Sequence, residues 1–316
     1  MVRVMYLALA IVIPYLLAII CFPLLARKGW LGQFTLIALC PPMALSPCLI
    51  PPVNRLPRFL AAVTAVVIIV KLLDHRHEVR RGGGPNWYVF VAFVMNPFVH
   101  VRRCLPMEPQ STLRMDLFRL IQSTFGLAGG IILLWLLFHV DWHALPFLAE
   151  HASKVTAFLL AVFSGLAIAS ALWRLSGGRA RDYMANPLAA TTPADFWRRY
   201  NRNMHQFFLK DVFVSVGGLR NPLRATLVVF VLSALMHEYI FGIAIGRVQG
   251  YQTSFFLIQG VAAAATARVK VGGLRALPWI VATLAFNLVT SVLFFASMNE
   301  LVHFYDRGLP TWLSGW

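Results

Sequence analysis

The sequence predicts an all-α polytopic membrane protein with about eight transmembrane helices, one re-entrant segment and one amphipathic helix on the cytoplasmic face. Three observations predict this fold class. The 316 residues are 59% hydrophobic and only 13% charged, and the mean hydropathy of +0.70 is too high for a soluble domain. Long apolar runs recur along the whole chain. The formal charge of +16 lies in the connections between those runs, a distribution typical of membrane topology rather than of nucleic-acid binding.

Eight apolar runs are predicted to cross the bilayer, within a single integral membrane domain that covers residues 1–316. The first run is too long for the core of a signal peptide and has no clear small-residue cleavage site, so we expect a retained span. The eight runs are residues 4–25, 34–50, 59–73, 117–138, 154–173, 223–246, 253–267 and 277–301.

A ninth run, residues 87–101, is short and is interrupted at Asn96-Pro97. The segments on either side of it, 71–81 and 102–114, are both basic, and basic loops face the cytoplasm. Because both flanks are expected on one side, we predict a re-entrant or protein-buried segment and not a crossing. His75 and His77 are then solvated loop residues.

The remaining connections give a consistent topology. Residues 140–153 contain no Lys or Arg and are predicted to lie outside, whereas the Arg-rich segments 174–224 and 268–275 lie inside. Both termini are then predicted to lie outside. The basic residues in the outside loop 51–58 are an exception to the rule that basic loops face the cytoplasm. The histidines around the outer loop either line an entrance for an acceptor or are interface residues without a function: His139, His143 and His151. Four scattered cysteines indicate neither a metal site nor a disulfide framework: Cys21, Cys40, Cys48 and Cys104.

Within the cytoplasmic segment, residues 186–218 predict an amphipathic helix at the membrane interface. Thr192 before Pro193 is a helix N-cap signal, and Asp195 falls in the first turn. Asn201 and His205 are four residues apart and share a face in such a helix; a solvated polar stripe explains this spacing equally well. The apolar side of the predicted helix carries Phe196, Trp197, Tyr200, Met204, Phe207 and Phe208.

The apolar run 221–246 contains His237 and Glu238. An acidic side chain near the middle of a bilayer costs about 2.5 to 3.5 kcal/mol on insertion scales, so such groups usually face a partner, a cavity or a pathway. At about 1.5 Å per residue, His237 lies about 21 Å along the helix counted from Leu223, past the middle of a hydrocarbon core of about 30 Å. We therefore take His237 as the principal candidate for chemistry.

The stretch PADFWRRYNRNMHQFF, the following DVFVSVGG and the later SALMHEYIFG resemble the membrane-bound O-acyltransferases, with the nearest likeness to the wax synthase and the sterol and diacylglycerol acyltransferase branches. The resemblance covers residues 186–246. It implies that His237 is the catalytic histidine of a membrane helix, that Asn201 is the family asparagine, and that His205 is the histidine that follows it. Ser233 and Glu238 fall within the same S-x-x-x-H-E pattern.

The chain departs from the family pattern in several places. Tyr200 stands where tryptophan usually precedes the asparagine, and the aromatic motif found upstream in sterol and diacylglycerol acyltransferases is missing. The alginate-acetylation branch usually has His where this chain has Asn201, which favours the lipid-acylating branches, although the rest of the motif leans the other way. The acceptor alcohol and the acyl length do not follow from the resemblance.

Acyl transfer from a thioester to an alcohol needs a base for the hydroxyl proton, and a neutral, buried His237 suits that task. Asn201 could donate its amide to the thioester carbonyl or to the tetrahedral oxyanion. The donor is then acyl-CoA or an acyl carrier protein, and no other cofactor and no metal is expected. Trp197 and Tyr200 lie in the same motif as possible substrate contacts. Basic side chains near Asn201 suit an anionic carrier, or else they snorkel toward anionic lipid: Arg198, Arg199, Arg202 and Lys210.

Other functions fit less well. A transporter or channel that uses His237 and Glu238 as a proton relay is the main alternative, but the chain shows no internal repeat. A structural membrane subunit is a third possibility. The HExxH zinc signature fails because Phe241 occupies the second ligand position, and Ser233 is more typical of a serine that bonds back to its own helix than of a nucleophile. Abundant arginine with little lysine is typical of a GC-rich bacterium and so favours a bacterial inner membrane, with the endoplasmic reticulum as the alternative location. The sequence does not indicate an oligomeric state.

Overall fold

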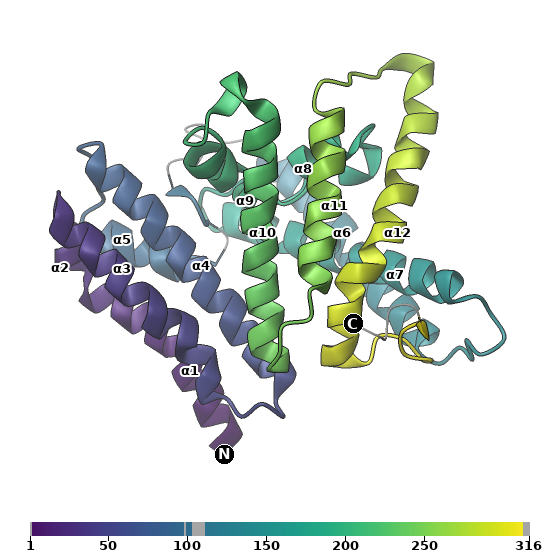
Figure 1. Ribbon diagram of the computed structural model, residues 1–316, viewed down its shortest axis with the longest axis horizontal. Coiled ribbons are helices and arrows are strands. Elements are labelled where there is room, and N and C mark those ends of the chain that lie inside the picture. Colours follow the sequence, from purple (N-terminus) through teal and green to yellow (C-terminus); the bar gives the residue numbers. More distant parts are fainter. Residues whose placement is uncertain (1, 98, 103–110, 312–316) are drawn as a thin grey trace. The chain divides into compact units, whose positions relative to one another are not determined.

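The computed structural model describes residues 2–97, 99–102 and 111–311, and all regular secondary structure within these ranges is helical. The predicted all-α class is confirmed for this part of the chain, as Figure 1 shows. The chain divides into two compact units. Unit 1 contains Met1–Leu105 and Leu235–Gln249, and unit 2 contains Pro106–Ala234 and Gly250–Trp316.

Within the described ranges, 6 helices are long and apolar enough to cross a membrane. One of them is α3 (Trp30–Leu45) together with the 3-10 turn η1 (Ser46–Leu49) that continues it. The other five are α4 (Arg55–Arg80), α6 (Leu113–Leu137), α7 (Phe147–Leu175), α10 (Pro222–Ile245) and α12 (Ala276–Val302). Two further expected spans fall on shorter helices, α1 (Val2–Ile20) and α11 (Tyr251–Thr266).

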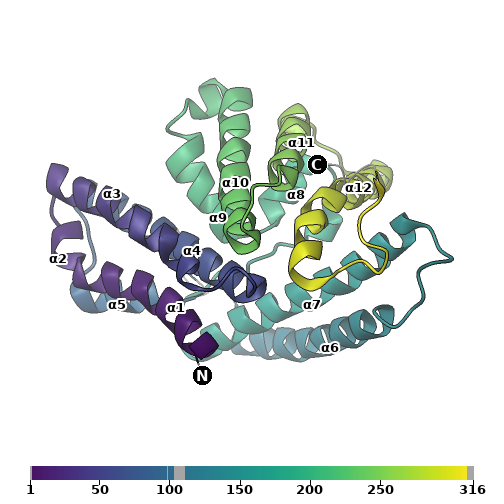
Figure 2. The ribbon, with the colours of Figure 1, turned by 60° about the horizontal axis from the view of Figure 1, so that its bottom comes forward.

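Unit 1 is built from α1, α3, α4 and the short helices α2 (Phe22–Leu25) and α5 (Trp87–Met95), together with the second half of α10. Helices α1, α3 and α4 pack against one another, as Figure 2 shows. Together with α2 and α5, these helices bury one apolar core, which consists of Ala18, Leu25, Leu36, Leu39, Met43, Ile68, Leu72, Phe90 and Val94.

Helix α5 has 9 residues and ends before Asn96. At about 1.5 Å per residue it is roughly 14 Å long, about half of a hydrocarbon core. Phe90 and Val94 are fully buried in the core of unit 1. Other residues of α5 are exposed, among them Trp87, Tyr88 and Met95. The length of α5 agrees with the expectation that this run is not a crossing, and its re-entrant or protein-buried nature stays a prediction.

The expectation of a solvated loop at 71–81 is wrong. Helix α4 continues to Arg80, and His75 is only 1% exposed, with its ring packed against Phe22 and Phe90. His77 is partly buried on the same helix.

Backbone carbonyls explain why these basic side chains are buried. Lys71 Nζ donates to the Phe93 carbonyl at 3.0 Å, at the end of α5, and cations are favourable at helix C-termini. Arg76 Nη1 donates to the carbonyls of Leu25 and Arg27 at 2.7 Å each. Each cation thus receives acceptors from a distant segment, so a basic run that is typical of a loop forms the last turns of a buried helix.

Unit 2 contains the hairpin of α6 and α7, which lie side by side in Figure 2. Glycines allow the two backbones to approach closely. A Cβ at Gly126 would lie 2.4 Å from the Ser164 hydroxyl oxygen, and one at Gly130 would lie 2.6 Å from the Ala161 backbone nitrogen. Small residues spaced four apart are a common means of helix association in lipid, where burial of apolar surface gives no driving force.

The rest of unit 2 packs α11 against α12 and brings the short helix α8 (Pro193–Arg199) against both. Gly260 on α11 permits a close approach to α10, because a Cβ there would lie 2.6 Å from the Cβ of Phe230. The aromatic core at this place consists of Phe230, Ala234, Phe255, Phe256 and Ala263. The short helix that begins the predicted motif is therefore docked on membrane-type helices.

Candidate functional site

The start of the motif region follows the predicted capping pattern. Thr192 is the N-cap of α8, and its hydroxyl oxygen accepts from the Asp195 backbone N–H at 3.1 Å. Pro193 occupies the first helical position, where a missing N–H is harmless. The Ala194 backbone N–H, another of the unsatisfied groups at the helix start, donates to Thr266 Oγ1 on α11 at 3.2 Å. Local sequence and tertiary contact thus fix the same helix start.

The predicted single amphipathic helix is wrong. Helix α8 ends at Arg199, and α9 (Arg202–Phe207) begins after a break at Tyr200 and Asn201. The chain then continues as a π-helix, η4 (Phe208–Phe213). The aromatic positions of the predicted helix therefore lie on separate elements, and they do not form one continuous stripe.

Asn201 is the residue that makes this break. Its φ is 39°, in the left-handed region, where asparagine is tolerated better than other non-glycine residues. Its side-chain oxygen accepts from the Met204 N–H at 3.3 Å and so caps α9. The predicted relation between Asn201 and His205 persists as a backbone bond, in which the His205 N–H donates to the Asn201 carbonyl at 2.9 Å.

Trp197 anchors α8 on the membrane helices. Its indole N–H donates to Gln259 Oε1 on α11 at 2.9 Å, and Gln259 Nε2 donates to Thr290 Oγ1 on α12 at 2.8 Å. Gln259 is fully buried. The Trp197 ring also packs against the rings of Phe230, Phe255 and Phe256. Trp197 therefore positions the motif in this structure; a direct contact with substrate stays a prediction.

Arg198 and Arg199 both pair with Asp195. Arg198 Nη2 lies 2.5 Å from Asp195 Oδ1, and Arg199 Nε lies 2.9 Å from Asp195 Oδ2. Burial raises the pKa of the Asp195 carboxyl, but hydrogen bonds from Arg199 and Arg198 outweigh it, and the pKa lies below its usual value. The Arg198 side chain is 69% exposed, so it can still meet an anionic ligand.

His205 lies partly buried on α9 among cations. Burial lowers its pKa from the usual value, and the charges of Arg198 and Arg202 lower it further. Burial also raises the pKa of the Tyr200 hydroxyl, which keeps this group protonated. The imidazole of His205 is therefore neutral at pH 7, as a proton acceptor or a neutral hydrogen-bonding group must be.

His237 lies partly buried on α10, and the side chains of Ser233, four residues before it, and of Glu238, directly after it, are buried. Glu238 Oε1 accepts from the Gln249 backbone N–H at 2.9 Å, which closes the turn after α10. The next residue, Tyr239, donates its hydroxyl to the Ala44 carbonyl on α3 at 2.5 Å. These contacts hold the second half of α10 in unit 1. His237 belongs to unit 1 and Asn201 to unit 2, and their meeting in a common chamber stays a prediction.

The outer histidines have different environments. His151 is fully buried: its Nδ1 lies 2.6 Å from the Tyr305 hydroxyl, and its Nε2 lies 2.9 Å from the Leu288 carbonyl. These two hydrogen bonds satisfy both ring nitrogens of His151 and account for the burial of this polar side chain. His139 is exposed, and its Nδ1 lies 2.8 Å from the Trp135 carbonyl oxygen.

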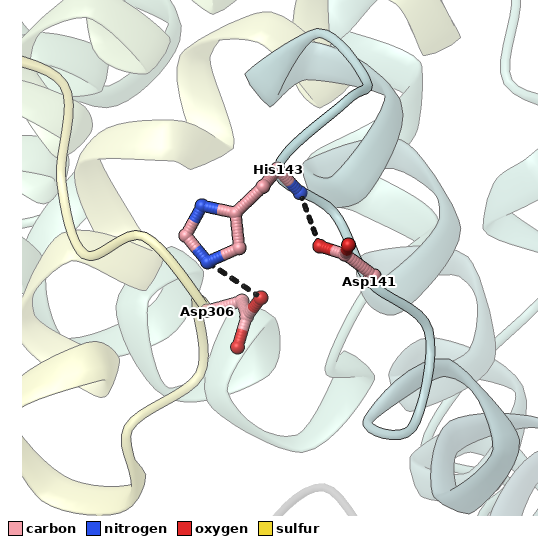
Figure 3. Close-up of side chains that lie close together, drawn as sticks. All are labelled: Asp141, His143 and Asp306. Carbon is pink, nitrogen blue, oxygen red and sulfur yellow. Dashed lines mark hydrogen bonds and ion pairs between the residues drawn. The ribbon is translucent and has the colours of Figure 1, made fainter.

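His143 lies beside two carboxylates, as Figure 3 shows. Its Nε2 lies 3.6 Å from Asp306 Oδ2, and its backbone N–H donates to Asp141 Oδ1 at 2.8 Å. One potential ligand atom from each of the three lies within 4.8 Å of the others, and all three residues are exposed. Such an exposed cluster is also common without an ion, and no metal role is assigned to it.

A buried ion pair supports this end of unit 2. Lys154 Nζ lies 2.6 Å from Glu150 Oε1, and both side chains are 1% exposed. Lys154 also donates to the Phe304 carbonyl at 3.0 Å, and the Asp306 N–H donates to Glu150 at 2.7 Å. The segment after α12 is thus tied to the start of α7.

Comparison with known proteins identifies the family. The model of MBOAT, the membrane-bound O-acyltransferase family, matches residues 117–298, which is more than half of the chain. The chain belongs to the membrane-bound O-acyltransferase family. It is also similar to sterol O-acyltransferase 2 of Candida albicans, with 30% identity over 95 residues. That match covers 29% of this chain and only 16% of the relative's length.

Membership and the long apolar helices indicate an integral, multi-pass membrane protein of this family, and the matched range contains Asn201, His205 and His237. The family predicted from the sequence is confirmed. The sequence analysis missed Gln259, although a polar residue inside an apolar run is itself a signal of a buried partner. Arg174 and Asp182 were not predicted either; they form ion pairs with Asp116 and Arg119, which lie far away in the sequence.

Proposed function

We propose that this membrane-bound O-acyltransferase moves an acyl group from a thioester donor to the hydroxyl group of a lipid, with His237 as general base and Asn201 as the donor to the oxyanion. The observation that carries the proposal is the match of the family model across residues 117–298, because it spans both groups. The left-handed backbone of Asn201 adds support, since strained residues cluster at functional sites.

In the proposed reaction, neutral His237 takes the proton of the acceptor hydroxyl as its oxygen attacks the thioester carbon. A new C–O bond forms, and the carbonyl oxygen becomes an oxyanion that the Asn201 amide stabilises. The tetrahedral intermediate then expels the sulfur, and the imidazolium of His237 returns the proton to the departing thiolate. The base thus ends the cycle in its starting state, and an ester and a free thiol are the products.

The donor is acyl-CoA or an acyl carrier protein, because both present phosphate to a cytoplasmic site. Arg198 supports this assignment through its exposure and through its place three residues from Asn201. Arg199, Trp197, Tyr200 and His205 complete the proposed donor site.

The acceptor is a lipid alcohol that enters from the bilayer, with Ser233 and Glu238 beside His237 on α10. The similarity to sterol O-acyltransferase 2 supports a sterol hydroxyl as one candidate, and a wax synthase-like transfer to a long-chain alcohol is another. The abundance of arginine over lysine supports a bacterial inner membrane as the location.

The proposal is tested by purifying the protein into lipid nanodiscs and measuring ester formation from labelled acyl-CoA or acylated carrier protein. The acceptors are a long-chain alcohol, a sterol and a diacylglycerol. We expect His237→Ala to lower the rate about 10²- to 10⁴-fold, which is the usual contribution of a general base. Leu235→Ala, which truncates an exposed side chain two residues earlier on α10, is the control and should leave the rate nearly unchanged. Full activity of His237→Ala would refute the assignment.

A further inference from the structure

Four charged side chains join the ends of α6 and α7 to the segment before the motif. Arg174, at the end of α7, donates through Nη2 to Asp116 at 2.7 Å and pairs through Nη1 with Asp182 at 2.9 Å. Arg119, on α6, pairs with Asp182 at 2.9 Å. The Arg174 and Asp116 side chains are only 9% and 5% exposed. Asp182 therefore receives two cations that are held by the membrane hairpin.

Residues 182–185, which we call the strap, lie against the break in the motif. The Arg202 backbone N–H donates to the Tyr183 carbonyl at 2.8 Å, and the Ala185 N–H donates to the Arg199 carbonyl at 2.9 Å. Between these two bonds, the Asn201 N–H lies 3.3 Å from the Met184 sulfur. The strap thus contacts the backbone before, at and after Asn201.

The contacts with the strap explain how Asn201 is held in its left-handed conformation. A non-glycine residue at φ 39° is less stable than in its preferred regions, and it persists only where the surroundings over-determine it. The N-cap bond of Asn201 to Met204 fixes only the side after the break. The strap contacts both sides of the break, and Asp182 joins the strap to the hairpin through its two ion pairs.

We propose that Asp182 is a positioning residue that holds the strap and, through it, the backbone of Asn201. A single exposed ion pair contributes little, but Asp182 shares its carboxylate between two arginines, one of which is nearly buried. Removing its charge leaves Arg174 with Asp116 and the Ala180 carbonyl, and takes away the ion pairs that join the strap itself to the hairpin. The consequence for catalysis rests on the proposed function of Asn201.

The first test does not use activity. Hydrogen exchange of the protein in nanodiscs is measured for wild type, Asp182→Asn and Glu78→Gln. Glu78→Gln is the matched control, because it removes a partly exposed pair with Arg102 in unit 1. We expect the amides of Ala185 and Arg202 to exchange at least about tenfold faster in Asp182→Asn only, since opening of a local structure sets the exchange rate. Unchanged exchange of both amides would overturn the role of Asp182 in the strap.

The second test measures acyl transfer. Asp182→Asn is expected to lower kcat about tenfold with little change in KM for the donor, because small misplacements of a reacting group act on the chemical step. Asp182→Glu, which keeps the charge, should recover most of the loss. In an Asn201→Ala background, Asp182→Asn should have no further effect on kcat. An equal loss in both backgrounds would show that Asp182 does not act through Asn201.

The two tests separate the two proposals. If acyl transfer does not depend on His237 or Asn201, the proposed function fails, but the exchange data still show whether Asp182 holds the strap in place. If exchange is unchanged but His237→Ala is inactive, the inference about Asp182 fails and the proposed function stands.

Discussion

Asn201 combines two features at the scale of a single residue: a left-handed backbone and an amide next to the proposed chemistry. They can be separated, because glycine adopts this conformation without strain but has no amide side chain. We expect Asn201→Gly and Asn201→Ala both to lower kcat by about 10²- to 10³-fold, as for other oxyanion donors. Thermal unfolding should separate them, with Asn201→Ala the less stable variant. Activity near wild type in Asn201→Gly would show that only the backbone conformation matters.

His205 gives a pH-dependent stability. Its folded-state pKa is lowered by burial and by the charges of Arg198 and Arg202, so the unfolded chain binds the proton first as the pH falls. The stabilisation is therefore complete above the unfolded pKa of about 6.5 and is lost as the pH falls below it toward the folded pKa.

We expect the wild type to lose thermal stability between pH 7.5 and pH 5, and His205→Gln to lose less over the same range. Thermal unfolding in detergent at a series of pH values measures this difference. His143→Gln, at an exposed histidine, is the control and should behave as wild type. An identical pH dependence in His205→Gln and wild type would contradict the burial of a neutral imidazole.

At the scale of helices, the close approach of α6 and α7 depends on Gly130. A Cβ at this position would lie 2.6 Å from a backbone atom of α7, so a larger side chain must separate the helices. We expect Gly130→Leu to lower the free energy of unfolding by about 1 to 3 kcal/mol, the usual penalty of overpacking. Thermal unfolding in detergent measures this loss.

Gly129→Leu is the matched control on the same helix, because nothing lies within 4 Å of a Cβ at Gly129. It should be neutral or slightly stabilising, since glycine is a poor helix former. Equal effects of the two substitutions would contradict the packing of α6 on α7 through Gly130.

Sequence reasoning succeeds for elements that depend on local chemistry. The start of α8 follows from Thr192 and Pro193 alone, and the long membrane helices follow from apolar runs. Sequence reasoning fails where contacts with a distant segment determine the local structure. The break at Asn201 depends on residues 183–185, and the burial of Lys71 depends on carbonyls at the end of α5. The spacing of apolar residues predicts neither contact, because both contacts join segments that are far apart in the chain.

In the candidate site too, some residues can be predicted from the sequence and others are revealed by tertiary contacts. The motif residues from Asn201 to His237 can be found from their pattern, and the family match supports that region. Gln259 and Asp182 lie outside the motif, and their partners Trp197 and Arg174 show what they hold in place. Pattern therefore identifies the residues proposed for chemistry, and structure identifies those that hold them in place.

At the scale of the whole molecule, the charge of the loops predicts which side of the membrane each one faces. His143→Cys and Arg179→Cys are placed in a background without Cys21, Cys40, Cys48 and Cys104; both positions are exposed. We expect an impermeant maleimide to label His143→Cys in intact cells and Arg179→Cys only after the membrane is opened. Labelling of both from one side would refute the predicted topology.

We propose that His237 and Asn201 act on one thioester, and a cryo-electron microscopy map of the protein in nanodiscs with an unreactive thioether analogue of the donor tests this directly. We expect the reacting carbon to lie within about 3 to 4 Å of both the His237 ring and the Asn201 amide. A map that places the two side chains in separate chambers, or packs the His237 ring against lipid away from the analogue, would contradict it.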